Sequence, residues 1–169
     1  MANLILWRHA EAEVESVSGK DTDRVLTKRG RKDALKMATW LQQHLPGNTE
    51  VLSSPARRCL ETAAALQCVN TAHKTKRQQQ SALLNVSVCD FLTIDSSVEM
   101  IAKNLINLGE DKTLLIVGHQ PNLGLLIAKL LGLKEHACAV KKGSVWWLRQ
   151  RLVNGALQTS LFTVQLPRY

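Results

Sequence analysis

The chain has 169 residues, a length that suits one domain with a core large enough to fold without disulfides or a structural metal. Hydrophobic residues make up 45% of it and charged residues 21%, which excludes a disordered or fibrous chain. The N-terminal apolar run lacks the basic flank and cleavage site of a signal peptide, and no later run is long enough to cross a bilayer. We therefore expect a cytoplasmic location and no membrane partner.

The formal net charge of +8 predicts attraction to anions: phosphorylated substrates, acidic protein surfaces or nucleic acid. Much of the excess lies between Lys20 and Lys36, where a solvated surface is the simplest explanation. No nucleic-acid recognition motif accompanies these residues, so nucleic acid is the weakest of the three. The four cysteines are scattered and form no C-x-x-C pair, so we expect reduced thiols, no metal site and no redox motif.

The apolar run at residues 4–7 is too short for a helix and predicts a buried strand, which ends in Arg8 and His9. A polar loop is expected over residues 11–23. Apolar residues then recur at helical spacing, with Thr27 as the N-cap and Pro46-Gly47 as the stop. Gly30 lowers the helix propensity of the first turn, and a close approach to another backbone would explain it.

The middle of the chain continues the alternation of strands and helices. Residues 50–53 predict a strand, and a helix follows with Pro55 in its first turn and its pattern running to residue 66. A weak alternation suggests an edge strand in residues 69–80, whereas residues 81–93 support no prediction. Ser96 and Glu99 form a capping box that predicts the start of a third helix, which Gly109 would end.

Residues 113–117 form the clearest predicted strand, continuously apolar as expected for a strand covered on both faces. Gly118 and His119 follow it, and a helix is expected from Pro121 to Gly132. Strands at residues 144–149 and 157–166 are joined through Asn154-Gly155, a hairpin turn signal. The pattern predicts an α/β fold, a three-layer sandwich with a mainly parallel central sheet.

The carboxyl ends of the parallel strands would meet at one edge of the sheet, where open α/β proteins bind ligands. There the topology would gather Arg8, His9, His119 and one of Arg57 or Arg58. This set is cationic, holds two imidazoles and lacks the carboxylates of a metal site. It suits the binding of phosphate.

These residues resemble the motifs of the histidine phosphatase superfamily, whose fold is phosphoglycerate-mutase-like. Its Arg-His-Gly signature corresponds to Arg8-His9-Ala10, and its Ser-Pro element with a following Arg and Thr resembles residues 54–62 in a register that selects Arg58. An apolar strand ending in Gly118-His119 matches the third motif, and Leu26-Thr27-x-x-Gly30 also fits, with Arg24 just ahead. The short chain looks like the SixA branch of phosphohistidine phosphatases, and the resemblance implies a single histidine phosphatase domain over residues 1–169.

The resemblance implies that His9 is the nucleophile and carries the phosphoryl group as a covalent intermediate. His119, as a cation or donor, would bind the equatorial oxygens together with Arg8 and Arg58. Arg24 and Gly118 would contribute to substrate binding. Neither a metal nor another cofactor is implied.

Two departures from the family pattern matter. Ala10 stands where the first motif has Gly, which would be costly if that position required a positive φ. No carboxylate occurs from Ala63 through Cys89, where many family members that cleave phosphate esters carry an acid. A phosphorylated imidazole has a better leaving group than an alcohol and depends less on such an acid, so its absence favours phosphohistidine.

We expect a phosphatase that acts on phosphohistidine of a signalling protein such as a histidine phosphotransfer domain. One alternative is a small-molecule phosphomonoesterase with Glu11 or Glu13 as the acid. A second is a module that binds phosphate or nucleic acid without turnover.

Overall fold

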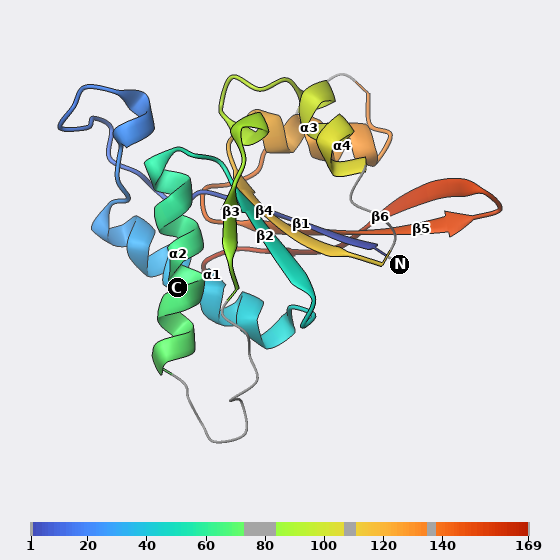
Figure 1. Cartoon of the computed structure of the whole chain (residues 1–169), viewed down its shortest axis with the longest axis horizontal. Helices are drawn as coiled ribbons and strands as arrows, with labels where there is room; N and C mark the ends of the chain where they lie inside the picture. Colours follow the sequence, from blue (N-terminus) through green and yellow to red (C-terminus); the bar gives the residue numbers. More distant parts are fainter. Residues whose placement is uncertain (1, 73–83, 107–110, 135–137, 169) are drawn as a thin grey trace.

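A twisted sheet forms the centre of the computed structural model, which describes residues 2–72, 84–106, 111–134 and 138–168 (Figure 1). The described strands follow the order β3-β2-β4-β1-β5-β6 across the sheet. Their bounds are β1 Ala2–Arg8, β2 Thr49–Ser53, β3 Val86–Val88, β4 Thr113–Gly118, β5 Val145–Val153 and β6 Ala156–Gln165. The first four run parallel, whereas β5 is antiparallel to β1 and β6 to β5. The predicted mainly parallel sheet is confirmed.

Helices cover both faces of this sheet. Helices α1 (Lys28–His44) and α2 (Arg57–Ala72) pack on one face, and α3 (Val98–Ile106) and α4 (Asn122–Leu130) pack on the other (Figure 1). Two short 3-10 helices, η1 (Asp21–Asp23) and η2 (Asp90–Leu92), lie in the connecting segments. The predicted three-layer sandwich is therefore confirmed. None of the helices in the described ranges has the length and hydropathy needed to cross a bilayer.

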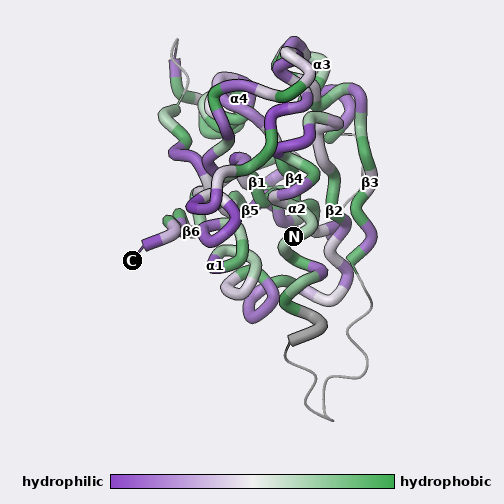
Figure 2. The backbone as a smooth tube through the Cα atoms, turned by 90° about the vertical axis from the view of Figure 1, so that its left-hand side faces the viewer, coloured by the Kyte–Doolittle hydropathy of each residue, from purple (hydrophilic) through white to green (hydrophobic). Residues whose placement is uncertain are grey.

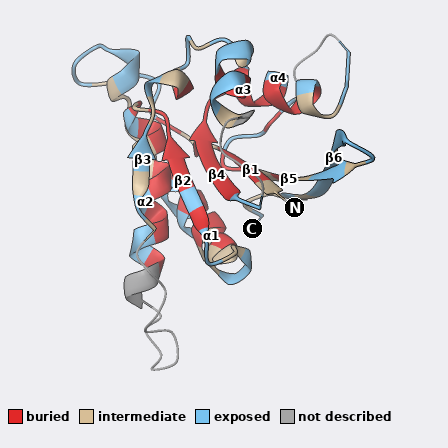
Figure 3. Cartoon of the chain, turned by 45° about the vertical axis from the view of Figure 1, so that its right-hand side comes forward, coloured by how far each residue is buried: buried red, intermediate tan, exposed pale blue. Residues whose placement is uncertain are grey.

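The core has two halves because successive side chains of a strand point to opposite faces. In β1, Ile5 and Trp7 pack with α1 and α2, whereas Leu4 and Leu6 pack with α3 and α4. Strand β4 is buried at every position, as its continuous apolar run predicts (Figure 3). Hydrophobic stretches accordingly follow the central strands in Figure 2.

The prediction of an edge strand after residue 69 was wrong where the structure tests it. Helix α2 continues to Ala72, because Val69 extends the buried stripe of Cys59, Ala63 and Leu66 at helical spacing. Residues 73–80 of that prediction lie outside the described residues. The edge strand is β3, in a stretch that gave no readable pattern because the strand has only three residues and two of them are exposed.

The third helix exists, but its N-cap was assigned one residue too early. The Ser97 hydroxyl accepts from the backbone N–H of Met100 at 3.2 Å, whereas the Ser96 hydroxyl lies 2.8 Å from that of Thr93. The Ser96 to Glu99 capping box is therefore not formed, since Ser96 pairs with the preceding turn. Gly109, the expected stop, lies outside the described residues.

Three local predictions are confirmed. The Thr27 hydroxyl caps α1 by accepting from the N–H of Gly30 at 2.9 Å. A Cβ at Gly30 would lie 1.9 Å from the carbonyl oxygen of Glu11, so the expected close approach of a backbone is real. Asn154 and Gly155 both have positive φ, 51° and 78°, as the tight turn between β5 and β6 requires.

Candidate active site

The carboxyl ends of three adjacent strands bring the candidate residues together. In the order β2-β4-β1, His119 directly follows the middle strand, Ser54 follows β2, and Arg8 and His9 close β1. Backbone hydrogen bonds connect the residues that follow β1 and β2 to the end of β4. The His9 N–H donates to the Gly118 carbonyl at 3.0 Å, and the Ser54 N–H donates to the Val117 carbonyl at 3.0 Å. Residues far apart in the sequence thus share one rigid edge.

His9 is held in the tautomer that a nucleophile needs. Its Nδ1 lies 2.8 Å from the Ala10 carbonyl oxygen, which can only accept, so Nδ1 carries the proton and Nε2 keeps its lone pair. The side chain is buried, and burial lowers the pKa of His9 to about 3. The charge that His119 gains when protonated and the positive charges of Arg58 and Arg8 act in the same direction, against the bond to Ala10. His9 is therefore neutral near pH 7.

His119 faces His9, with the ring centroids 5.4 Å apart. Its Nδ1 accepts from Arg58 Nη2 at 3.3 Å, and its Nε2 donates to the Ser54 hydroxyl at 2.7 Å. Burial and then the charge of Arg58 lower the pKa of His119 to about 4. The ring is therefore neutral in this structure. Of the two forms that the resemblance allowed, a cation or a donor, the structure contains the neutral donor.

The structure separates the two neighbouring arginines. The Arg58 side chain is 1% exposed and contacts His119, whereas that of Arg57 is 60% exposed and pairs with Glu61 on the outside of α2. Adjacent helical residues point about 100° apart, which explains why one of them faces the imidazoles and the other does not. The motif register had favoured Arg58.

Arg8 reaches the same edge from β1, where its Nη1 donates to the Val140 carbonyl at 2.7 Å. Within the described residues, the Nε–H groups of Arg8 and Arg58 are shielded from solvent and have no hydrogen-bond acceptor. Buried donors are costly to leave unpaired, so these two groups call for an acceptor in the site. An anion with several oxygens would satisfy both.

Gly118 is the last residue of β4 and pairs in register with Arg8. Its carbonyl orients the His9 backbone, and a Cβ at this position would come within 3.3 Å of Leu123 Cδ2. Its predicted contact with substrate stays a prediction.

The η1 segment, which begins with Asp21, lies next to the start of α2 (Figure 1). The carbonyl of Asp21 accepts from Arg58 Nη1 at 2.8 Å and its Oδ2 from Arg58 Nη2 at 3.0 Å. Its Oδ1 lies 2.9 Å from Arg24 Nε, so the predicted substrate ligand Arg24 joins the site through Asp21. Partial burial raises the pKa of Asp21, but the hydrogen bond and charge of Arg58, together with Arg24, outweigh this and lower it overall.

Of the two glutamates considered as acids, Glu11 has its carboxylate engaged elsewhere. The Glu11 carboxylate accepts from the Thr27 hydroxyl at 3.0 Å at the start of α1. Glu13 is exposed, and its backbone carbonyl accepts from Arg24 at 3.1 Å.

Ala10 is accommodated without strain. It is absent from the positive-φ positions of the described chain, which are Asp111 and Asn154 apart from glycines, and its methyl group is fully buried. The Ala10 N–H donates to the buried Thr62 hydroxyl at 3.1 Å, and that hydroxyl donates to the Arg58 carbonyl at 2.7 Å. Thr62 therefore ties the residue after His9 to the first turn of α2.

Sequence reasoning missed four contributors to this geometry. Ser54 and Thr62 belonged to the quoted motif, yet nothing in the pattern showed which atoms they would hold. Asp21 carried no signal, because one aspartate in a polar loop is ordinary. Cys59, whose Sγ lies 3.5 Å from His119 Nε2, also packs here, and burial raises its pKa to about 12, so it stays a thiol.

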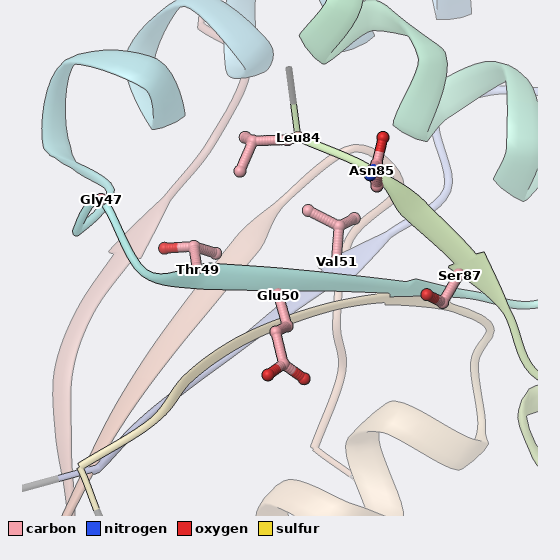
Figure 4. Close-up of a pocket in the computed structure, with 7 residues that line it drawn as sticks. All are labelled: Gly47, Thr49, Glu50, Val51, Leu84, Asn85 and Ser87. Carbon is pink, nitrogen blue, oxygen red and sulfur yellow. The ribbon is translucent and has the colours of Figure 1, made fainter. Parts of the chain in front are cut away.

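One cavity lies at the other end of the sheet. A cavity of about 260 Å³ is lined by residues of β2, β3 and the turns before them: Gly47, Thr49, Glu50, Val51, Leu84, Asn85 and Ser87 (Figure 4). These residues lie at the start of β2, whereas the imidazoles lie beyond the strand ends.

Among the residues described, no group of three or more His, Cys, Asp or Glu side chains could hold a metal ion.

Comparison with known proteins places this arrangement in a family. The model of the "Histidine phosphatase superfamily (branch 1)" matches residues 4–83, which include His9 and Arg58. A relative from Haemophilus influenzae, described as a phosphohistidine phosphatase SixA homolog, is 31% identical over 133 residues, covering 77% of each chain.

Solved structures with the same architecture cover almost the whole chain. The structure described as a "putative phosphohistidine phosphatase SixA" from Nakamurella multipartitia has a TM-score of 0.72 at 25% identity, over 98% of this chain and 96% of that one. The structure from Agrobacterium tumefaciens, described in the same words, has a TM-score of 0.75 at 20% identity, over 98% of this chain and 97% of that one. A SixA structure complexed with tungstate has a TM-score of 0.74 at 20% identity, also over 98% and 97%. The predicted phosphoglycerate-mutase-like fold is confirmed.

Proposed function

The chain belongs to the histidine phosphatase superfamily and is a histidine phosphatase; on this premise, we propose that it removes phosphate from phosphohistidine on a protein, with His9 as nucleophile. The curated relative is described as a phosphohistidine phosphatase homolog. The net charge of +8 suits an acidic phosphoprotein such as a histidine phosphotransfer domain.

In the proposed reaction, the lone pair on His9 Nε2 attacks phosphorus in line with the leaving nitrogen. A P–N bond to His9 forms as the substrate P–N bond breaks, and the substrate ring, protonated at its other nitrogen, keeps the electron pair and leaves as neutral imidazole. Water then attacks the phosphoryl group on His9, which releases inorganic phosphate and restores the neutral ring. Arg8 and Arg58 hold the phosphoryl oxygens throughout and stabilise the charge of the transition state.

One observation carries this proposal: a neutral imidazole with a free lone pair lies beside buried arginine N–H groups that have no acceptor. The bond to Ala10 orients the ring, and a pKa of about 3 keeps it unprotonated. A phosphoryl group supplies both an electrophile for Nε2 and oxygens for the arginines. Neither a packing role nor a structural ion pair explains both features.

The local carboxylates support the choice of phosphohistidine over a phosphate ester. An alkoxide leaving group needs a proton in the transition state. Glu11 is held by Thr27, and both oxygens of Asp21 are held by arginines, with its pKa lowered overall. A phosphorylated imidazole tolerates this arrangement better than an alcohol does.

The test is to trap the intermediate. Brief reaction with a ³²P-phosphohistidine peptide, followed by quenching, should label the protein with phosphate that is lost in acid and kept in alkali. His9→Ala should abolish both label and turnover. Acid-stable label would refute a phosphohistidine intermediate, and fast turnover of sugar phosphates with none of the peptide would identify a small-molecule phosphomonoesterase instead.

The two neighbouring arginines provide a matched pair for the phosphate-binding role. Arg58→Ala should lower kcat about 10²- to 10³-fold, because it removes a preorganised donor to the transferring group. Arg57→Ala removes the same charge one residue away, on the exposed side of α2, and should change kcat less than about twofold. Equal losses in both variants would show that net positive charge matters rather than the geometry of Arg58.

We also propose that the whole chain forms one catalytic domain and works in the cytoplasm. The four cysteines, all among the residues that the structure describes, form no disulfide, as expected in a reducing compartment. Fractionation of cells that express the chain, followed by assay of each fraction with the phosphohistidine peptide, tests the location.

A further inference from the structure

Asp21 forms the outer end of a connected polar chain that reaches the inner imidazole. One Asp21 oxygen binds Arg24, the other binds Arg58, and Arg58 in turn donates to His119 Nδ1. The Asp21 carbonyl accepts from the second terminal nitrogen of Arg58, so Asp21 accepts two hydrogen bonds from the same guanidinium. The Asp21 side chain is 54% exposed, whereas that of Arg58 is 1% exposed. The carboxylate therefore sets the position of a cation that lies inside the protein.

The contact between Arg58 and His119 has a consequence for proton binding. Arg58 Nη2 and His119 Nδ1 lie 3.3 Å apart and share one hydrogen, which Arg58 donates. If the ring gains a proton at Nδ1, both atoms become donors, and an acceptor oxygen must come between or beside them. A phosphoryl oxygen is such an acceptor. Phosphate binding and protonation of His119 therefore favour each other.

The groups that face His119 include more positive than negative charge. They are Arg8 at the end of β1 and His9 just after it, Asp21 and Arg24 at η1, and Arg58 and Cys59 on α2. Burial, Arg58, Arg8 and Arg24 lower the pKa of His119, and the charge of Asp21 raises it. Without that negative charge, protonation of the ring would be harder still.

From these contacts we propose that Asp21 is a positioning residue of the phosphatase site: it holds Arg58 against His119, and its charge supports protonation of His119 when a phosphoryl group binds. This rests on the proposed function for its role in turnover, but not for its effect on His119. Asp21 touches the arginines and not the reacting atoms, so it acts through them.

Three variants separate the two parts of the proposal. Asp21→Asn keeps an oxygen acceptor for Arg58 and removes the charge, whereas Asp21→Ala removes both. Asp23→Asn is the matched control, because the Asp23 carboxylate accepts from the Ser18 and Thr22 hydroxyls on the same loop. Asp23→Asn should leave kcat within about twofold of the unsubstituted protein.

The first readout needs no turnover. NMR titration of the histidine rings in saturating inorganic phosphate should show the His119 midpoint lowered by roughly 0.5 to 1 pH unit in Asp21→Asn, a charge effect reduced by the exposure of the carboxylate. The His9 midpoint should move less, since Asp21 is not among the groups that act on it. An unchanged His119 midpoint would overturn the electrostatic part of the proposal.

The second readout is the pH profile of kcat on the phosphohistidine peptide. Asp21→Asn should move the basic limb of the kcat profile to lower pH, because His119 loses its proton at a lower pH. Asp21→Ala should lower kcat a further roughly tenfold, because Arg58 is no longer held by the side chain at position 21. A loss that is uniform across pH would show a merely structural role. If the unsubstituted protein forms no phosphoenzyme, the proposed function fails, while the NMR result still decides the effect of Asp21 on His119.

Discussion

Acidification should destabilise the protein through its two buried imidazoles. Unfolding exposes His9 and His119 and returns each pKa to about 6.5, whereas the folded values are about 3 and about 4. Between pH 6.5 and 3 the unfolded chain therefore binds more protons, so the free energy of unfolding falls as the pH falls. Above pH 6.5 both states hold neutral rings and this contribution vanishes.

The size of the effect follows from those values. At pH 4 the unfolded His9 is almost fully protonated and the folded His9 is almost fully neutral, a difference of about 3 kcal/mol. His119, with a folded pKa of about 4, is half protonated in the folded state at pH 4, and the same linkage relation gives about 3 kcal/mol for it. Together they approach the total stability of an ordinary domain, roughly 5–15 kcal/mol. The protein should thus be marginal near pH 4 although it is stable at pH 7.

Urea unfolding at pH 7, 5 and 4 measures this directly. His9→Gln cannot be protonated, so its free energy of unfolding should fall by about 3 kcal/mol less than that of the unsubstituted protein between pH 7 and pH 4. His44→Gln is the control, because His44 is exposed at the end of α1. If His9→Gln and the unsubstituted protein lose equal stability over this range, His9 is not buried in its neutral form, and the argument for its free lone pair fails.

Two further predictions concern the groups that support the site. Gly30→Ala should destabilise the fold by about 2 kcal/mol or more, since the added Cβ meets the Glu11 carbonyl at 1.9 Å and outweighs a gain in helix propensity of about 1 kcal/mol. Gly47→Ala, with nothing within 4 Å of the added Cβ, should stay within about 1 kcal/mol in the same urea assay, and equal effects would show that the backbone contact carries no energy. Ser54→Ala should lower kcat about tenfold with little change in KM, because His119 Nε2 loses its partner; an unchanged kcat in a stopped-flow assay would show that the ring is held by packing alone.

The sequence determined the architecture because its signals are local. Buried strands show as short apolar runs, and Thr27 and Asn154-Gly155 mark a helix start and a turn through their own backbone chemistry. The signals fail where they are weak: a three-residue edge strand gives no pattern, and the weak alternation at the end of α2 wrongly predicts a strand. The candidate site was predictable as a set of residue types, because parallel strands must deliver their carboxyl ends to one edge.

Only the tertiary structure decided the states of those residues. The tautomer of His9 depends on the Ala10 carbonyl, and the neutrality of His119 depends on burial and on Arg58, which is 61 positions away. The choice of Arg58 over Arg57 came from a resemblance, and the helix orientation gave it a physical reason. Asp21 was invisible in the sequence because its importance comes from two arginines that approach it through space. A pKa and a hydrogen bond are properties of an environment, and that environment exists only when the chain is folded.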